Sequence, residues 1–112
     1  MKDYKLGEFE EIVLLTVGVL YDEAYGVAIK DEIESRVGRR VSVGALQSAL
    51  RRMEKKGYLI SRVGEKNTLR GGKPKRYFAI TAYGKQALEE SKDVRNRLWD
   101  AIPKIAFEFR AS

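Results

Sequence analysis

The side chains best suited to chemistry are the cations and hydrogen-bonding groups between residues 36 and 76. This stretch holds 13 basic and 2 acidic side chains, whereas residues 1–35 hold 3 basic and 9 acidic ones. A basic block inside a folded segment, rather than on a tail, is typical of a surface that binds a polyanion. We therefore predict nucleic acid as the partner, in preference to a solvated basic face that has none.

Other chemistries lack the residues they need. The 112 residues include no histidine and no cysteine. This composition excludes disulfides, zinc sites of the usual Cys/His kind and histidine-based catalysis. The carboxylates concentrate at two helix starts, where they form no nucleophile–base pair. We predict a protein that is not an enzyme and that uses no metal and no cofactor.

The apolar segments are too short to cross a bilayer. The most apolar one, residues 12–21, has acidic pairs on both sides, and a spanning helix needs about 20 apolar residues. No charged-then-apolar leader with a small-residue cleavage site opens the sequence. With 44% hydrophobic and 34% charged residues, the composition is that of a globular protein of one domain. We expect it in the cytoplasm.

A helix over residues 42–56 carries the most informative pattern. Ser42 suits the N-cap position, because its hydroxyl can accept from a free backbone amide. Spacings of three, four and three predict a narrow inward seam of Val43, Leu46, Leu50 and Met53. The opposite face has small residues first, hydrogen-bonding ones next and cations last: Gly44, Ala45, Gln47, Ser48, Arg51, Arg52 and Lys55. Small residues let a helix approach a major groove, where Gln, Ser and Arg can contact base edges or phosphates.

Two short strands with a basic loop follow this helix. Residues 58–63 and 76–80 are rich in aromatic and β-branched side chains, as strands prefer. Gly71, Gly72 and Pro74 favour a flexible loop over a helix. The cations of the loop are Lys66, Arg70, Lys73 and Lys75. A nucleotide-phosphate loop is a weak alternative, because Gly-Gly-Lys here lacks the required spacing and does not join a strand to a helix.

Two helices must precede and position this unit. Residues 8–21 predict a helix with an apolar stripe at helical spacing, formed by Phe9, Ile12, Val13, Thr16, Val17 and Leu20. Leu14, Leu15 and Val19 widen the stripe and predict burial on more than one side. A second helix is expected from about Ala24 to Val37, with Ile29, Ile33 and Val37 facing the core and Gly38 as its stop.

A last helix is expected from Ala82 onward, with Thr81 as its cap. An apolar stripe along it has nothing left to cover within so short a chain, so a partner chain is the simplest cover. The expected dimer contacts are Leu88, Val94, Leu98, Trp99, Ile102, Ile105 and Phe109. Pro103 should kink or end the helix near Ile102. Trp99 is expected as a dimer anchor; stacking of a flat ligand on its ring is the alternative.

The order helix, helix, helix, hairpin is that of the winged helix-turn-helix, an α+β and mainly α fold. We assign residues 1–81 to a DNA-binding domain of three helices and a two-stranded wing, and residues 82–112 to a C-terminal dimerisation helix. In this arrangement the third helix enters the major groove, and the wing lies along the backbone or in the minor groove.

Four segments in this order resemble the PadR family of bacterial transcriptional regulators. They are residues 6–10, the Ala-Tyr-Gly at 24–26, residues 41–57, and the stretch from Lys75 to Gly84. The resemblance implies a homodimeric winged-helix repressor whose C-terminal helix forms the dimer. It also implies that a planar aromatic or phenolic effector could relieve repression. The family often has tyrosine after Gly-Ala-Leu, where this chain has Gln47, which could read an adenine edge with two hydrogen bonds.

We thus expect a sequence-specific regulator that binds a pseudo-palindromic operator in double-stranded DNA. Gln47, Ser48 and Arg51 are the predicted base readers, and the other cations are predicted to contact phosphates. The full predicted DNA-binding set is Ser42, Gly44, Ala45, Gln47, Ser48, Arg51, Arg52, Lys55, Lys66, Arg70, Lys73, Lys75, Arg76 and Tyr77. The alternative is a winged-helix interaction module whose basic face binds an acidic protein.

Overall fold

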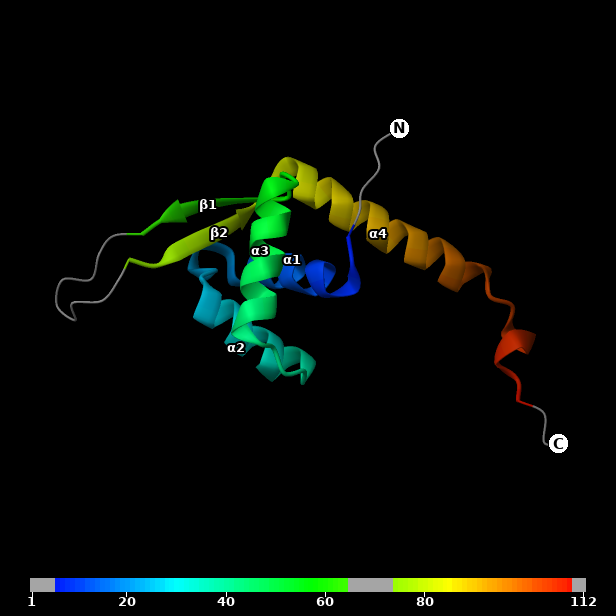
Figure 1. Ribbon diagram of the computed structural model, residues 1–112. Helices are drawn as coiled ribbons and strands as arrows, with labels where there is room; N and C mark the ends of the chain where they lie inside the picture. The colour runs from blue at the N-terminus through cyan, green and yellow to red at the C-terminus, as the bar shows by residue number, and fades with distance from the viewer. Residues whose placement is uncertain (1–5, 65–73, 110–112) are drawn as a thin grey trace.

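A computed structural model describes residues 6–64 and 74–109 of the chain. Its elements, in chain order, are α1 (Glu8–Leu20), the 3-10 turn η1 (Tyr21–Glu23), α2 (Gly26–Val37), α3 (Val43–Lys55), β1 (Leu59–Val63), β2 (Arg76–Ile80), α4 (Ala82–Ala101) and the 3-10 turn η2 (Lys104–Phe107). Figure 1 shows three helices and a hairpin gathered together, with α4 leading away from them. The predicted winged-helix order is confirmed.

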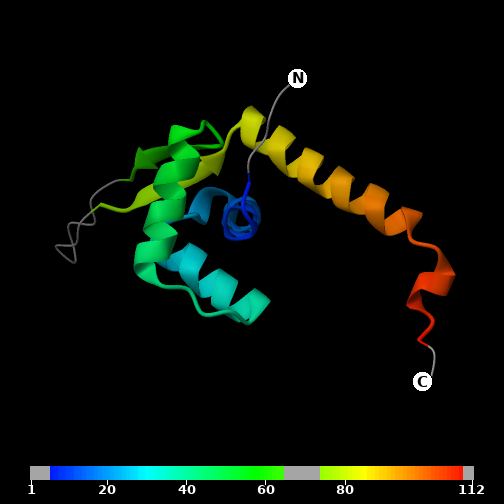
Figure 2. The same ribbon diagram turned by 45° about the vertical axis from the view of Figure 1, so that its right-hand side comes forward.

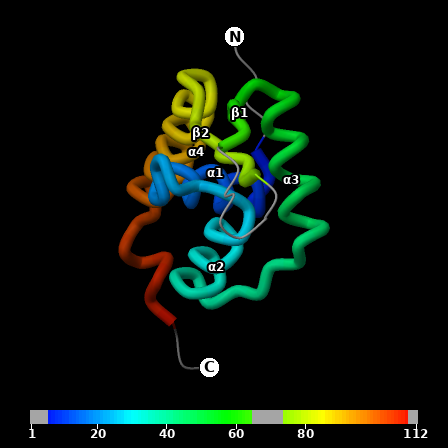
Figure 3. The backbone as a smooth tube through the Cα atoms, turned by 90° about the vertical axis from the view of Figure 1, so that its left-hand side faces the viewer, coloured from blue at the N-terminus to red at the C-terminus, as the bar shows by residue number. Residues whose placement is uncertain are grey.

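The core lies where α1, α2 and α3 meet the base of the hairpin. Its largest fully buried side chains come from all three helices, and they are Val13, Leu14, Val17, Ile29, Ile33, Leu46, Leu50 and Met53. Tyr58, Leu59 and Phe78 close it from the hairpin side. Burial of large aliphatic side chains is the main source of stability in a domain of this size. In Figure 3, α1 lies between α3 and α4, so α3 keeps one side free.

The hairpin is antiparallel, and its register runs from Leu59 opposite Ile80 to Val63 opposite Arg76. It is also tied to the connection between α1 and α2. The Phe78 backbone N–H donates to the Ala24 carbonyl at 2.8 Å, and Tyr25 forms a bridge with Tyr77. These backbone contacts fix the base of the wing to the helical part of the domain.

Local signals set most of the helix ends. Gly38 adopts a left-handed conformation (φ 72°) after α2, which glycine does without steric cost. The Thr81 hydroxyl accepts from the Gly84 N–H at 3.0 Å and caps α4, as predicted. The second helix begins at Gly26 rather than at Ala24, because the Ala24 carbonyl accepts from the Phe78 N–H and the extended Tyr25 forms a bridge with Tyr77.

Four predicted core positions are wrong. Leu15 and Val19 lie on the solvent face of α1, and Val37 is exposed at the end of α2. Val43, expected in the inward seam of α3, is 61% exposed. It is the first residue of α3, and side chains lean toward the N-terminus of their helix, so this one extends beyond the packed surface. Ala49 is buried in the seam instead.

The last helix is anchored at its start and free at its end. Gly84 packs against the backbone of Tyr58, and Ala87 is buried. Beyond residue 91 every described side chain is exposed, and Figure 2 shows this half of α4 standing clear of the domain. Ile102 is extended (ψ 120°) before Pro103, which disfavours a helical residue in front of it. The predicted helix end near Ile102 is confirmed.

Candidate nucleic-acid interface

One side of α3 faces solvent with the predicted order of residue types. The Ser42 hydroxyl accepts from the Ala45 backbone N–H at 3.1 Å, which caps the helix. Leu46, Leu50 and Met53 hold the opposite side in the core. Ser48 is half-buried, and the exposed residues of the outer side are Gly44, Ala45, Gln47, Arg51 and Lys55. The helix therefore presents small residues at its N-terminal end and cations toward its C-terminal end.

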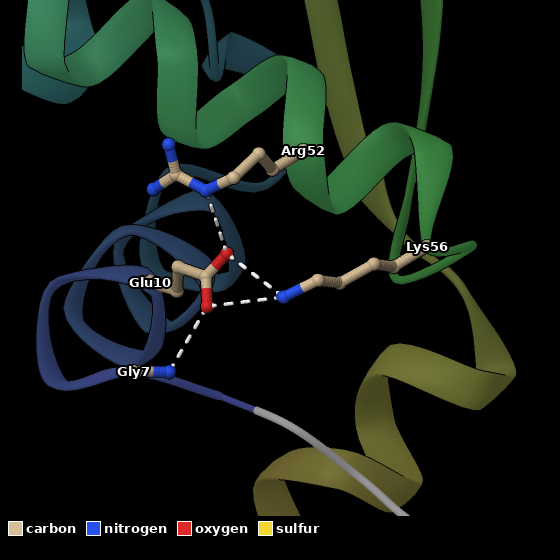
Figure 4. A network of polar contacts seen from close by, with 4 residues as sticks. All are labelled: Gly7, Glu10, Arg52 and Lys56. Atoms are coloured by element: carbon tan, nitrogen blue, oxygen red, sulfur yellow. Dashed lines mark hydrogen bonds and ion pairs between the residues drawn. The ribbon is translucent and has the colours of Figure 1, made fainter.

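The cations of α3 and of its C-cap residue, Lys56, divide into two pairs with different surroundings. Arg52 and Lys56 turn toward α1, where both contact the Glu10 carboxylate, with Arg52 Nε at 3.3 Å and Lys56 Nζ at 3.2 Å from Oε2 (Figure 4). Arg51 and Lys55 form no ion pair with any carboxylate in residues 6–64 and 74–109. Arg51 and Lys55 are thus available to an external anion. Arg52 is half-exposed, and its phosphate contact stays a prediction.

Glu10 is the buried centre of this network, with a side chain only 8% exposed. Burial alone would raise the pKa of its carboxyl group. Hydrogen bonds from the Gly7 backbone N–H at 2.9 Å, from Lys56 and from Arg52 outweigh burial and hold the pKa below its ordinary value of 4.5. Glu10 is therefore ionised at neutral pH and draws two cations away from the outer face of α3.

Much of the acidic first third of the chain is neutralised within the domain. Besides the Glu10 network, residues 6–64 and 74–109 contain four pairs in which a carboxylate lies within 4 Å of a cation, which are Glu8–Arg39, Glu11–Arg95, Lys30–Glu34 and Glu32–Arg36. In these pairs, cations neutralise carboxylates of α1 and α2. The excess of positive charge is left on the outer side of α3 and on the hairpin, as a DNA interface needs.

Alternating cations and aromatic rings line the base of the wing. The Arg62 guanidinium lies 4.7 Å from the centre of the Tyr77 ring, and Lys75 Nζ lies 4.0 Å from that of Tyr25. The two rings meet edge to face at 5.6 Å. Such stacking orients a cation without neutralising it. Lys75 therefore keeps its charge for a phosphate while its direction is fixed.

The remaining wing predictions fall in two groups. Arg76 is exposed at the start of β2, and its Nη1 donates to the Ser61 hydroxyl at 3.0 Å. Lys66, Arg70 and Lys73 lie outside the described residues. The DNA contacts assigned to all of these residues, and to those of α3, stay predictions.

The start of α2 belongs to the same surface, which the sequence pattern did not indicate. A hollow of about 210 Å³ lies between α2, α3 and the wing base, lined by Tyr25, Gly26, Val27, Lys30, Val43, Leu46, Gln47, Lys75 and Arg76. A Cβ at Gly26 would lie 3.3 Å from the Gln47 amide nitrogen, so Gln47 rests against the helix start. The signal available was the Ala-Tyr-Gly at residues 24–26.

Comparison with protein families decides the identity of the fold. The profile described as transcriptional regulator PadR-like family matches residues 14–90, which include the whole of α2, α3 and the wing. The chain belongs to the PadR-like family. Members of this family regulate transcription by binding DNA, so this PadR-like chain is a DNA-binding transcription regulator. No curated protein sequence matches it significantly.

Solved structures of PadR proteins share this fold. A PadR family transcriptional regulator from Eggerthella lenta is 26% identical with a TM-score of 0.67, over 91% of this chain and 88% of that one. A PadR family regulator from Clostridium difficile is 27% identical with a TM-score of 0.62, over 80% and 91% of the two chains. A PadR-like regulator from Bacillus cereus is 21% identical with a TM-score of 0.70, over 90% and 93%.

Two further properties concern the described residues alone. No helix in residues 6–64 and 74–109 is long and apolar enough to span a membrane. Over the same ranges, no three acidic residues gather closely enough to hold a metal ion.

Proposed function

We propose that this PadR-like chain is a homodimeric repressor that recognises a specific operator and is released by a small planar effector. The observation that carries the proposal is the outer side of α3, where Arg51 and Lys55 form no ion pair among the described residues while Glu10 holds Arg52 and Lys56. Gln47 and Ser48 precede them on the same side. This helix supplies base reading at its start and phosphate binding toward its end.

Residues 1–81 form the DNA-binding domain in this proposal, and residues 82–112 form the dimerisation element. Support comes from the apolar side chains that α4 and η2 leave in solvent, which are Val94, Leu98, Trp99, Ile102, Ile105, Phe107 and Phe109. Leu88 packs partly on the core. An exposed apolar surface of this extent marks an interface. A second copy related by a two-fold axis covers it and sets two α3 helices about 34 Å apart, which matches a pseudo-palindrome.

The effector site is assigned to the region of Trp99. Its ring is exposed and lies 5.7 Å from the ring of Phe107, which belongs to the 3-10 turn η2 that follows Pro103. Two neighbouring rings on an apolar surface suit a flat aromatic or phenolic molecule. Quenching of Trp99 fluorescence by such molecules, with weaker DNA binding in their presence, supports the assignment. If no member of a broad panel quenches it, the assignment fails.

The test of DNA binding is the salt dependence of affinity for a labelled duplex, followed by fluorescence anisotropy. Lys55, Lys75 and Arg76 from two protomers alone give six phosphate contacts, so the log–log slope should be about −5 or steeper. An affinity for duplex that does not change with salt refutes the proposal. Retention of an acidic protein but not of duplex at physiological salt would favour an interaction module instead.

The dimer is tested with Leu98→Glu, which places a charge on the exposed apolar side of α4. Sedimentation should show monomers with unchanged helical content and weaker binding to a full operator. Ile60→Glu is the matched control, because Ile60 is similarly exposed but lies on β1. It should remain a dimer. A wild-type chain that sediments as a monomer would contradict this part of the proposal.

A further inference from the structure

The hollow between α2, α3 and the wing base contains two valines that the fold does not bury. Val27 is 65% exposed and Val43 is 61% exposed, and both line the hollow beside Gln47. Valine in solvent contributes no packing, whereas covering a methyl group is worth about 0.8 kcal/mol. These side chains therefore gain stabilisation only when something apolar fills the hollow.

The charges around the hollow indicate which class of partner carries the apolar group that fills it. Lys30, Lys75 and Arg76 also line it. Lys30 is paired with Glu34 at 3.1 Å, and Lys75 is stacked on Tyr25. Among the described residues that line the hollow, none carries a carboxylate that would repel an anion. A surface of cations around two valines fits a polyanion that carries a methyl group. Among the four bases of DNA, only thymine presents a methyl group in the major groove.

Gln47 favours an A·T base pair as well, because it can read the adenine that pairs with a thymine. Its amide nitrogen lies against the start of α2, and it has no hydrogen-bond partner among the described residues. A glutamine amide with free donors and acceptors pairs well with N6 and N7 of adenine. An adenine read by Gln47 has thymine opposite it, and the methyl group of that thymine, or of a thymine in a neighbouring base pair, is the candidate to fill the hollow beside Gln47.

We propose that Val27 and Val43 form a thymine-methyl site that helps to determine the operator sequence. This inference rests on the proposed binding of DNA through α3. The methyl group and the ring edge that carries it enter the hollow, while the surrounding cations meet the flanking phosphates. Val43 is then a specificity residue of α3, and Val27 extends recognition to the start of α2.

The experiment uses the full chain and duplexes selected by it from a random pool. Each thymine of the selected site is replaced singly by deoxyuridine, which lacks only the methyl group. We expect one position in each half-site at which this replacement weakens binding about fourfold, the factor that one buried methyl group provides. The loss should shrink strongly in Val27→Ala or Val43→Ala, because the two changes remove the same contact.

Val37→Ala is the matched control, because Val37 is an exposed valine of α2 that does not line the hollow. It should keep the full sensitivity to deoxyuridine. If no position is sensitive, if the selected sites share no thymine, or if both alanine variants keep the sensitivity, the inference is overturned. Binding to no duplex at all would instead defeat the proposed function itself.

Discussion

Removing the charge of Glu10 tests the network in which Glu10 binds Arg52 and Lys56. Glu10→Gln keeps the shape of the side chain and one carbonyl oxygen that can accept from the Gly7 N–H. It removes the negative charge that faces Arg52 and Lys56, and its amide nitrogen cannot accept from either cation. The variant should therefore unfold more easily than the wild type.

The size of the effect follows from the burial of the partners. Hydrogen bonds to a charged group contribute about 1.5–3 kcal/mol. Glu10 is almost fully buried, but Arg52 and Lys56 are partly exposed and can turn to water when their partner is lost. We expect a loss of about 2 kcal/mol in the free energy of unfolding, toward the lower end of that range. In a domain of this size the loss corresponds to a fall in Tm of about 8 °C.

Urea denaturation at several pH values measures the loss in the free energy of unfolding and shows whether it depends on the charge of Glu10. The folded state lowers the pKa of Glu10 below 4.5, so its contribution to stability is present above that pH. It is lost as the pH falls through the lower, folded-state pKa. The gap between wild type and Glu10→Gln should close over the same range. Glu8→Gln is the control, because Glu8 is exposed and its pair with Arg39 contributes about 1 kcal/mol or less. Equal losses in the two variants would refute the reasoning.

Two further predictions concern DNA reading and packing. Arg51→Ala should relax preference at one base pair by about 1–3 kcal/mol, whereas Lys55→Ala should weaken all sequences alike and reduce the salt slope by about 1 per protomer. Competition between cognate and random duplexes distinguishes them, and equal losses on both duplexes for Arg51→Ala would contradict its role. Gly84→Ala should cost about 1–3 kcal/mol, because its Cβ would overlap the Tyr58 carbonyl. Chemical denaturation measures this cost, and a neutral result would mean that α4 can shift without loss.

Residues that act on their close neighbours along the chain predicted most ends of the helices and strands correctly. Ser42 and Thr81 cap their helices through their own hydroxyls, and Gly38 ends α2. The strand at residues 76–80 has the predicted bounds, and the last helix ends where Pro103 requires it. Each of these residues imposes its conformation on its immediate neighbours, so the sequence alone contains the information.

Properties that depend on distant partners could not be predicted in this way. Helical spacing placed Val43 in the inward seam, but Val43 is exposed, because at the first position of α3 it extends beyond the packed surface. Likewise Arg51 and Arg52 are adjacent in sequence and identical in type. Glu10, 42 residues away from Arg52, separates their roles by binding only the second. Composition identified the basic block, and tertiary contacts decide which of its cations face a ligand.

The anchoring of α4 determines how a signal at Trp99 can reach the DNA-binding surface. Glu11 of α1 accepts hydrogen bonds from Ser91 at 2.8 Å and pairs with Arg95 at 2.8 Å, and Gly84 is packed under Tyr58. Residues 84–95 of α4 are thus joined to α1 and the hairpin, and the hairpin is joined through Ala24 to the connection between α1 and α2. A rotation of α4 against a partner would carry α3 and the wing with it as one body. In the proposed dimer, the proposed effector at Trp99 would therefore act by changing the spacing of two intact DNA-binding surfaces, since that requires no rearrangement within either of them.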